Sequence, residues 1–205
     1  YYKVRAINDE FGYYSSGYSL VVSITTKLDV PTLSVNSYSY NSIKINYEEI
    51  VGADGYMIYR ATSKNGKYSL IKTTTALSYI DTKLTTGKTY YYKVRAYSYS
   101  GKNVKYYSGY SSIKNNSPKV VKPTFSVSSY DYNKNKIVIN KTSGATGYAI
   151  YRSTSENGKY SKITTTTKTT YYDSNLTTGK TYYYKVVAYR TVYGSRKYGY
   201  YSNII

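Results

Sequence analysis

The chain has 205 residues, which is enough for one large domain or two domains of about 100 residues each. It contains neither Cys nor His, and this excludes zinc sites, Cys–His proteases and Ser–His–Asp triads. Ten acidic residues against 29 basic ones give a net charge of +19, leaving few carboxylates for acid–base chemistry or calcium binding. With 35 Tyr, 2 Phe and no Trp, the chain is a poor candidate for an enzyme. We expect no cofactor and no bound metal.

The side-chain pattern favours folded β-structure over disorder. High net charge combined with low hydrophobicity is typical of disordered chains. Here the tyrosines fall in runs that alternate with Val, Ile and Thr, which favour strands. No run approaches about 18 consecutive apolar residues, so we expect no membrane span. The absence of Cys does not decide between the cytosol and the exterior, because many exported bacterial proteins also lack disulfides.

The chain opens inside an internal repeat. Residues 1–6 (YYKVRA) match residues 91–96. Residues 52–98 match residues 144–190 at about 33 of roughly 47 positions, with a spacing of about 92 residues. We therefore expect an array in which the first copy is represented only by its last part.

Three prolines mark the boundaries of the copies. Pro31 opens one copy, and Pro118 and Pro123 flank the junction before the next. Proline cannot donate a hydrogen bond to a sheet ladder, so it collects at strand starts and linkers. The expected domains are the last two strands, F and G, of a preceding domain at 1–28 and two full domains at 30–119 and 120–205. Because the linkers are short, we expect a semi-extended rod.

Within each copy, short strands alternate inward and outward side chains. Ile43, Ile45 and Tyr47 alternate with polar residues, and Tyr56 and Ile58 continue the pattern. Asn-Gly pairs at 65–66 and 157–158 indicate tight hairpins. The clearest series points Tyr90, Tyr92, Val94 and Ala96 inward and Tyr91, Lys93, Arg95 and Tyr97 outward. About seven strands in about 90 residues, without helical periodicity, predict an antiparallel β-sandwich.

One motif carries a family resemblance. Residues 84–96 (LTTGKTYYYKVRA), repeated at 176–188, resemble the segment before and along strand F of fibronectin type III domains. The resemblance covers both full copies and the partial one. It implies an all-β fold of tandem seven-stranded antiparallel sandwiches with an immunoglobulin-like architecture. It also implies a tyrosine corner at Tyr90 and Tyr182, in which the hydroxyl bonds to upstream backbone.

The resemblance has further implications and two departures. The phrase GYxIYRxTSxNGKY is similar to tandem modules of secreted or cell-surface proteins of low-GC Gram-positive bacteria. The tryptophan usual in strand B of the family is replaced by Tyr47 in one copy and, on this reading, by Lys141 in the other. No Arg-Gly-Asp tripeptide is present, so the integrin-binding role of some family members is not implied.

Basic and aromatic residues form the main candidate site. Strands C, F and G lie side by side in such a sandwich, so their outward residues share one face. Tyrosine rings stack on sugars, and Lys and Arg attract phosphate or carboxylate, so this face suits an anionic wall polymer or an acidic glycan. Alternatively, Tyr and Thr fill exposed strand positions through β propensity, while Lys gives solubility and protects edges. The candidate residues are Tyr59, Tyr91, Lys93, Arg95, Tyr97, Tyr151, Tyr183, Lys185 and Tyr189.

Other features are weaker candidates. The F–G loops at 98–107 and 190–198 diverge between copies, and loops on a rigid sandwich often carry binding function. Asp81 and Asp173 follow strands and are interpreted as turn caps. The charge is spread evenly and no nucleic-acid motif is present, so we expect no specific nucleic-acid partner.

The sequence predicts a non-catalytic extracellular array. We expect a structural spacer that also supports surface interaction in a secreted or cell-surface bacterial protein. One alternative is a glycan- or cell-wall-binding module that uses the outward Tyr and Lys. Another is a self-assembling surface filament, in which residues 1–28 are completed by strands of another chain. The expected partners are anionic cell-wall polymers, glycans, surface proteins or further copies of the chain.

Overall fold

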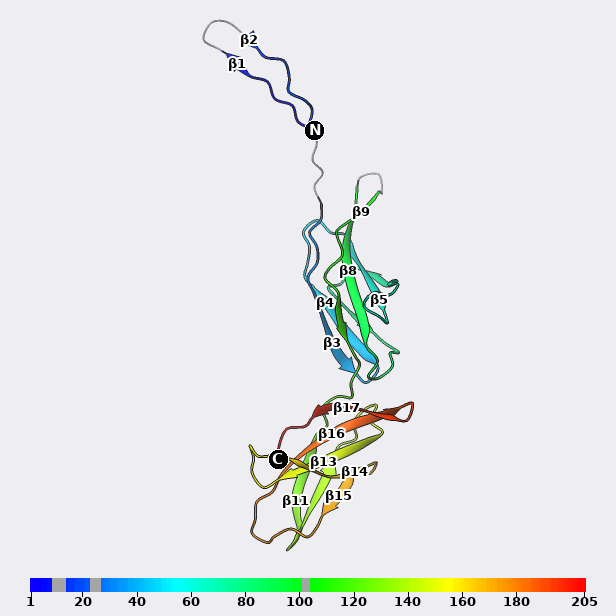
Figure 1. Cartoon of the computed structure of the whole chain (residues 1–205), viewed down its shortest axis with the longest axis vertical. Helices are drawn as coiled ribbons and strands as arrows, with labels where there is room; N and C mark the ends of the chain where they lie inside the picture. The colour runs from blue at the N-terminus through cyan, green and yellow to red at the C-terminus, as the bar shows by residue number, and fades with distance from the viewer. Residues whose placement is uncertain (9–13, 23–26, 101–103) are drawn as a thin grey trace.

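A computed structural model describes residues 1–8, 14–22, 27–100 and 104–205 of the chain. The described residues form strands and loops, and among them there is no helix long and apolar enough to cross a membrane. Near the N-terminus, β1 (Ile7–Asn8) pairs antiparallel with β2 (Tyr14–Ser15). The remaining strands form two sandwiches placed end to end (Figure 1). The expected domain limits at 1–28, 30–119 and 120–205 stay predictions.

The first sandwich packs a three-stranded sheet against a larger one. The smaller sheet has the order β3-β4-β7, and the larger one has the order β10-β8-β5-β6, with β9 also paired to β8. The C, F and G positions of the predicted sandwich correspond to β5, β8 and the pair β9 and β10, which do lie side by side. The strands are β3 (Leu33–Ser39), β4 (Ser42–Tyr47), β5 (Gly55–Ala61), β6 (Ser69–Thr74), β7 (Ser78–Asp81), β8 (Tyr90–Tyr99), β9 (Lys105–Tyr107) and β10 (Lys114–Asn116).

The second sandwich repeats this arrangement. Its sheets have the orders β11-β12-β15 and β14-β13-β16-β17. Even the register is the same, because Ile58 pairs with Val94 in the first sandwich and Ile150 pairs with Val186 in the second. The all-β fold class is therefore confirmed, and seven strands per sandwich is compatible with this topology. The strands are β11 (Phe125–Asp131), β12 (Lys134–Ile139), β13 (Gly147–Ser153), β14 (Ser161–Thr166), β15 (Thr170–Asp173), β16 (Tyr183–Val192) and β17 (Ser195–Tyr201).

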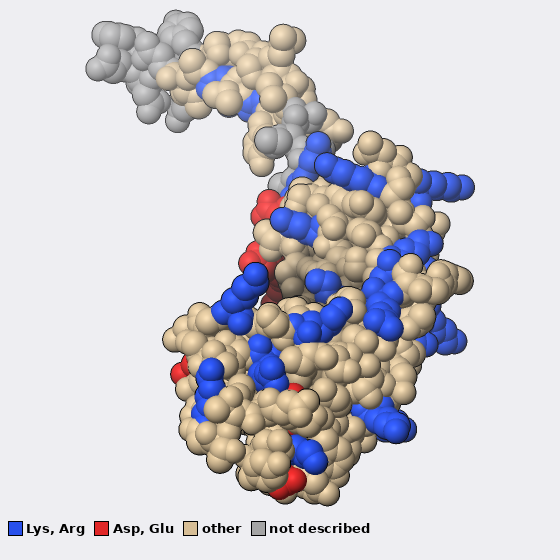
Figure 2. Space-filling view, turned by 60° about the horizontal axis from the view of Figure 1, so that its bottom comes forward, with Lys and Arg blue, Asp and Glu red and all other residues tan. Residues whose placement is uncertain are grey.

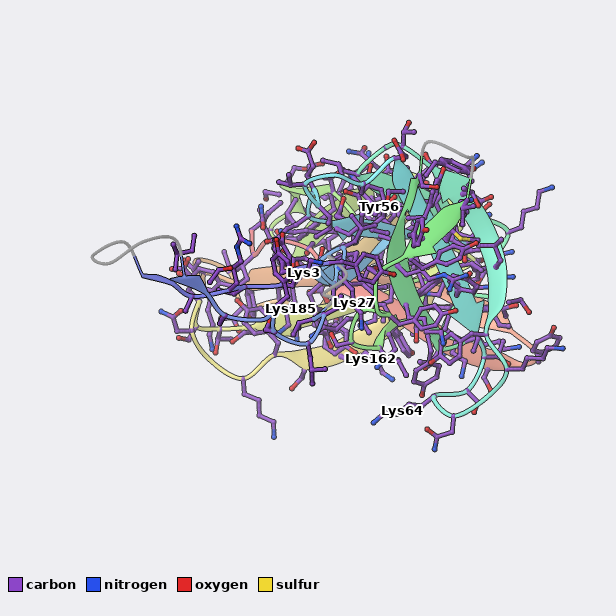
Figure 3. The ribbon with its side chains drawn as sticks, turned by 90° about the horizontal axis from the view of Figure 1, so that it is seen from above. Lys3, Lys27, Tyr56, Lys64, Lys162 and Lys185 are labelled. Atoms are coloured by element: carbon purple, nitrogen blue, oxygen red, sulfur yellow. The ribbon has the colours of Figure 1, made fainter. Side chains whose placement is uncertain are left out.

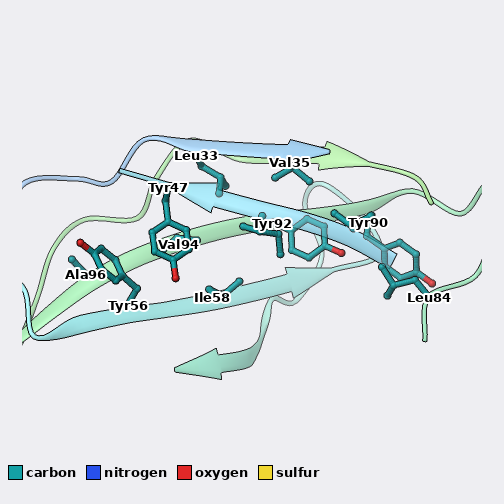
Figure 4. Packing of buried hydrophobic residues seen from close by; sticks show 12 residues of the cluster. Leu33, Val35, Tyr47, Tyr56, Ile58, Leu84, Tyr90, Tyr92, Val94 and Ala96 are labelled. Atoms are coloured by element: carbon teal, nitrogen blue, oxygen red, sulfur yellow. The ribbon is translucent and has the colours of Figure 1, made fainter. Parts of the chain in front are cut away.

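Each sandwich encloses its own core. Alternate residues of β8 turn inward, and Tyr92, Val94 and Ala96 are fully buried, as the alternation predicts. Figure 4 shows these side chains facing those of the opposite sheet. The buried cluster of the first sandwich consists of Leu33, Val35, Ile43, Ile45, Tyr47, Tyr56, Ile58, Leu84, Tyr90, Tyr92, Val94 and Ala96.

Tyrosine fills much of this core, and each buried hydroxyl has a partner. The Tyr47 hydroxyl donates to the carbonyl of Ala76 at 2.6 Å, and the Tyr56 hydroxyl accepts from the backbone N–H of Ile50 at 2.8 Å. The Tyr90 hydroxyl accepts from the backbone N–H of Thr85 at 3.0 Å, which is the expected tyrosine corner. Tyr182 makes the equivalent bond to Thr177 in the second sandwich. Such partners remove the cost of burying a hydroxyl group.

A buried carboxylate ties the two sheets together in each sandwich. Nη1 of Arg60 on β5 donates to both carboxylate oxygens of Asp81 on β7 at 2.9 Å, and the Tyr92 hydroxyl on β8 donates to the same carboxylate at 2.9 Å. Asp81 is only 4% exposed. In the second sandwich, Arg152, Asp173 and Tyr184 repeat the cluster. We call these two clusters the inter-sheet clamps.

The clamps correct the interpretation of the two aspartates as turn caps. A turn cap binds nearby backbone, whereas these carboxylates accept hydrogen bonds from side chains of the opposite sheet. A second correction concerns strand B. Leu33 pairs with Tyr47, and Phe125 pairs with Ile139 in the same register, so the counterpart of Tyr47 is the buried Ile139. Lys141 lies beyond the end of β12, where its charge stays exposed.

The clamp predicts a large loss of stability for Asp81→Ala. The substitution leaves the Tyr92 hydroxyl and the Arg60 guanidinium without their shared acceptor, and we expect a loss of about 3 kcal/mol in the free energy of unfolding. Urea denaturation followed by circular dichroism measures this loss. Asp131→Ala is the control, because its contact with Lys134 at 3.7 Å is exposed. Its loss should stay below about 1 kcal/mol, and equal losses for the two variants would contradict the role of the clamp.

The core tyrosines also predict unfolding in alkali. Burial raises the pKa of Tyr92 and of Tyr184, and the neighbouring Asp81 or Asp173 carboxylate raises it further. A raised folded pKa contributes stability that is fully present below the unfolded pKa of about 10 and is lost as the pH rises above it. We expect an ultraviolet tyrosinate titration in two phases, in which exposed tyrosines ionise first and the rest ionise together with loss of the circular dichroism signal. A single phase near pH 10 with retained structure would contradict this prediction.

Candidate functional site

The structure places all nine candidate residues on the larger sheet of each sandwich, on the side away from the core. Tyr59 and Tyr151 come from β5 and β13, and the others come from β8 and β16. Their positions follow from strand alternation, because neighbours along β8 point to opposite sides of the sheet. The candidate residues therefore share one face in each sandwich. Their surroundings differ, and they fall into three groups: residues in cation–tyrosine stacks, buried rings, and half-buried rings outside the stacks.

In the first sandwich, the cations of this face lie on tyrosine rings. The Arg95 guanidinium is 3.8 Å from the ring centre of Tyr107 and 5.2 Å from that of Tyr110. The Lys93 ammonium is 3.7 Å from the ring centre of Tyr110. Tyr59 meets Tyr110 edge to face, with ring centres 5.3 Å apart. These contacts match the geometry of cation–π and T-shaped aromatic pairs.

The second sandwich has a smaller version of the same stack. The Lys185 ammonium is 4.4 Å from the ring centre of Tyr160 and 4.7 Å from that of Tyr201. Tyr151 meets Tyr201 edge to face at 5.4 Å. Burial and the Tyr201 hydroxyl raise the pKa of Tyr151 to about 12, so its hydroxyl stays protonated at neutral pH. The counterpart of Arg95 is Val187, which is almost completely buried, so the face is not conserved between the two copies.

Tyr97 and Tyr189 differ from the expectation that they are open to solvent. They are 8% and 4% exposed. Each ring lies over a glycine, Gly55 or Gly147, where an added Cβ would overlap the tyrosine. Each ring is also covered by a cation. The Lys105 ammonium is 3.7 Å from the ring centre of Tyr97, and the Arg196 guanidinium of the second sandwich takes the same place.

Tyr91 and Tyr183 make up the third group. Both are half-buried, and in the described part of the chain neither ring belongs to the stacks above. They pair across the sheet with Ala61 and Ser153, which are small residues. Because neither ring is covered by a described aromatic or cationic side chain in these stacks, they are the candidates to test for ligand stacking.

Sequence reasoning missed the tyrosines that cover the cations. Tyr68 and Tyr160 belong to the repeated phrase NGKY, which indicates a hairpin and a family resemblance but not a contact with Lys93 or Lys185. Tyr107 is the last residue of the divergent F–G loop at 98–107, and Tyr110 and Tyr201 follow the two F–G loops. Residues 101–103 of the first loop lie outside the described residues. In the second loop, Tyr193 is 95% exposed at the hairpin tip, and its φ of 47° is in the left-handed region.

Comparison with known proteins supports the fold. Neither the family models nor the curated proteins gave a match to the chain. Among solved structures, the chain is similar to a segment of two fibronectin type III domains from chicken tenascin, with a TM-score of 0.50 and 17% identity over 85% of this chain and 98% of the other. The described sandwiches therefore have the fibronectin type III fold.

Two further solved structures resemble the chain more loosely. The FN1–FN3 domains of chicken CNTN1 match with a TM-score of 0.41 and 16% identity, over 99% of this chain and 75% of the other. The structure of FN3tt matches with a TM-score of 0.38 and 20% identity, over 45% of this chain and 97% of the other.

The stacks predict that Tyr110 stabilises the first sandwich from outside the core. Tyr110→Ser removes the ring that Tyr59, Lys93 and Arg95 contact, and we expect a loss of about 1 kcal/mol in the free energy of unfolding. Tyr106→Ser is the control, because the Tyr106 ring has similar exposure but is not part of this stack. Equal urea midpoints for Tyr110→Ser and the parent protein would show that the stack contributes nothing.

Proposed function

We propose that the chain is a non-catalytic, extracellular modular array. It serves as a structural spacer and surface-interaction module in a secreted or cell-surface protein of a low-GC Gram-positive bacterium. The observation that carries the spacer role is that the chain's own cations cover most of the outward rings. A ring that already holds Lys or Arg on its face has little surface left for stacking on a sugar.

The energetics of the two faces support the same role. The inter-sheet clamps and the core tyrosines hold each sandwich from inside, and the cation–tyrosine stacks hold it from outside. Interactions of this kind stabilise a scaffold, whereas a binding site needs groups that are free to meet a ligand. Because one fold hosts many functions, it is the occupancy of these side chains that favours the spacer.

One observation favours the second candidate, a cell-wall- or glycan-binding module. Among the described residues, Arg95 forms no ion pair, so no carboxylate neutralises its charge. Lys and Arg side chains are spread over both sandwiches in the face shown in Figure 2, and Lys64 extends outward from the turn after β5 (Figure 3). A surface with this excess of positive charge attracts anionic polymers over a distance set by ionic strength.

A sedimentation assay separates the two candidates. The full chain is mixed with Gram-positive wall sacculi, with and without teichoic acids, at low and high salt. For a spacer, we expect only binding that needs teichoic acids and disappears at high salt. The reason is that the Debye length falls from about 10 Å at 0.1 M salt to about 3 Å at 1 M. The double variant Tyr91→Ser/Tyr183→Ser should then bind like the parent protein.

A different result in the same assay would contradict the spacer role. Binding that survives high salt and is lost in the Tyr91→Ser/Tyr183→Ser variant would show that these tyrosines stack on a wall glycan. The chain would then be a binding module and not a spacer. The matched control is Tyr38→Ser/Tyr130→Ser, which removes two tyrosines from β3 and β11, outside the candidate face. Their side chains are 55% and 59% exposed, and they occupy equivalent places in the two copies.

A further inference from the structure

Tyr40 reaches from the first sandwich into the second. It lies in the turn between β3 and β4, and its ring packs against the core cluster of the second sandwich. The ring fills a notch above Gly144, in the loop between β12 and β13, where an added Cβ would overlap it. Gly144 also has a φ of +76°, a backbone conformation that residues other than glycine rarely adopt. The notch therefore depends on glycine for both space and backbone conformation.

Arg190 closes the notch from the side. Its Nη1 donates to the carbonyl of Gly144 at 3.0 Å, and its guanidinium lies 4.9 Å from the ring centre of Tyr40. On the first sandwich, the hydroxyl of Thr86 donates to the carbonyl of Tyr40 at 2.5 Å and holds the turn in place. The Tyr40 ring is thus fixed from both sides of the junction.

The linker and a second contact reinforce this arrangement. The backbone N–H of Gly87 donates to the carbonyl of Pro118 at 2.9 Å, and the backbone N–H of Lys119 donates to the Ser37 hydroxyl at 2.8 Å. These bonds fasten the linker to the end of the first sandwich. The side chain of Lys197 on β17 lies against Gly87, so close that an added Cβ would come 2.9 Å from its Cγ and Cδ.

The repeat supplies an internal comparison. Tyr132 is the counterpart of Tyr40, and its carbonyl accepts the same hydrogen bond, from the Thr178 hydroxyl at 2.9 Å. It lies at the far end of the second sandwich and is 74% exposed. The counterpart of Arg190 in the first sandwich is Ser98. The same turn tyrosine is thus covered at the junction of the two sandwiches and exposed at the far end of the second sandwich in the described chain.

We propose that Tyr40, Gly144 and Arg190 form an interlocking joint that fixes the orientation of the two sandwiches, so that the pair moves as one stiff unit. This inference deepens the proposed spacer function and rests on it for its biological meaning. Without such contacts, domains joined by a short linker are expected to move relative to each other. The joint turns two flexibly linked modules into a spacer of defined length.

Spin labelling tests the joint directly, and the absence of native cysteine makes labelling specific. The labels are placed in the full chain at Lys72→Cys on β6 and Lys162→Cys on β14, two exposed positions on different sandwiches. Double electron–electron resonance gives the distribution of distances between them. We expect one narrow distribution for the parent protein. For Tyr40→Ser and Arg190→Ser we expect a distribution broader by about twofold or more, because free domain motion returns.

Tyr132→Ser is the matched control, and its distribution should stay as narrow as that of the parent protein. Arg190→Ser is the second variant because the first sandwich carries Ser98 at the same place and is folded. Unchanged widths in both joint variants, or a broad distribution in the parent protein, would overturn the proposal. These outcomes concern distances between sandwiches, so they are distinct from a failure of the spacer function, which the wall-binding assay reports.

Discussion

One buried carboxylate in each sandwich holds the two sheets together, and the rest of the structure depends on that link. Asp81 lies on the smaller sheet, and its two donors, Arg60 and Tyr92, lie on the larger sheet, so the cluster spans the core. A buried charge without partners would be costly, but here both carboxylate oxygens accept hydrogen bonds. In a chain without Cys, this polar cross-link joins the two sheets from β7 to β5 and β8, whereas antibody domains join theirs by a disulfide between strands B and F.

The shortage of acidic residues shapes the surface in turn. Only 10 acidic side chains face 29 basic ones, and two of the acids are consumed inside the clamps. Most cations therefore lack a carboxylate partner, and tyrosine rings take over as their electrostatic partners. Tyrosine serves both sides of the sheet for one reason: its ring packs like an apolar group while its hydroxyl and π-face meet polar groups. The high Tyr content and the high positive charge are thus linked, because the tyrosine rings provide contacts for the cations that have no carboxylate partner.

Local patterns in the sequence predicted much of this fold. Alternation along residues 90–96 predicted the buried face, and the motif around Tyr90 predicted the tyrosine corner. The clamp escaped prediction because Arg60 and Asp81 are 21 residues apart and on different sheets, and no local pattern links them. The burial of Tyr97 also depends on a distant residue, since only the absence of a side chain at Gly55 on the neighbouring strand lets the ring lie flat. Alternation assigns a residue to a face, but the opposite strand decides whether that face is open.

The shared register of the two sandwiches has a consequence for how the chain folds. Strands β8 and β16 pair with β5 and β13 through equivalent residues, and most of those residues are identical. Each strand is thus a chemically acceptable partner for the other copy, and exchange between neighbours is a hazard of similar tandem domains. Synthesis from the N-terminus counters this hazard, since β8 can close the first sandwich before β16 has left the ribosome. Refolding of the two sandwiches together from denaturant lacks that protection, because all strands then compete at once.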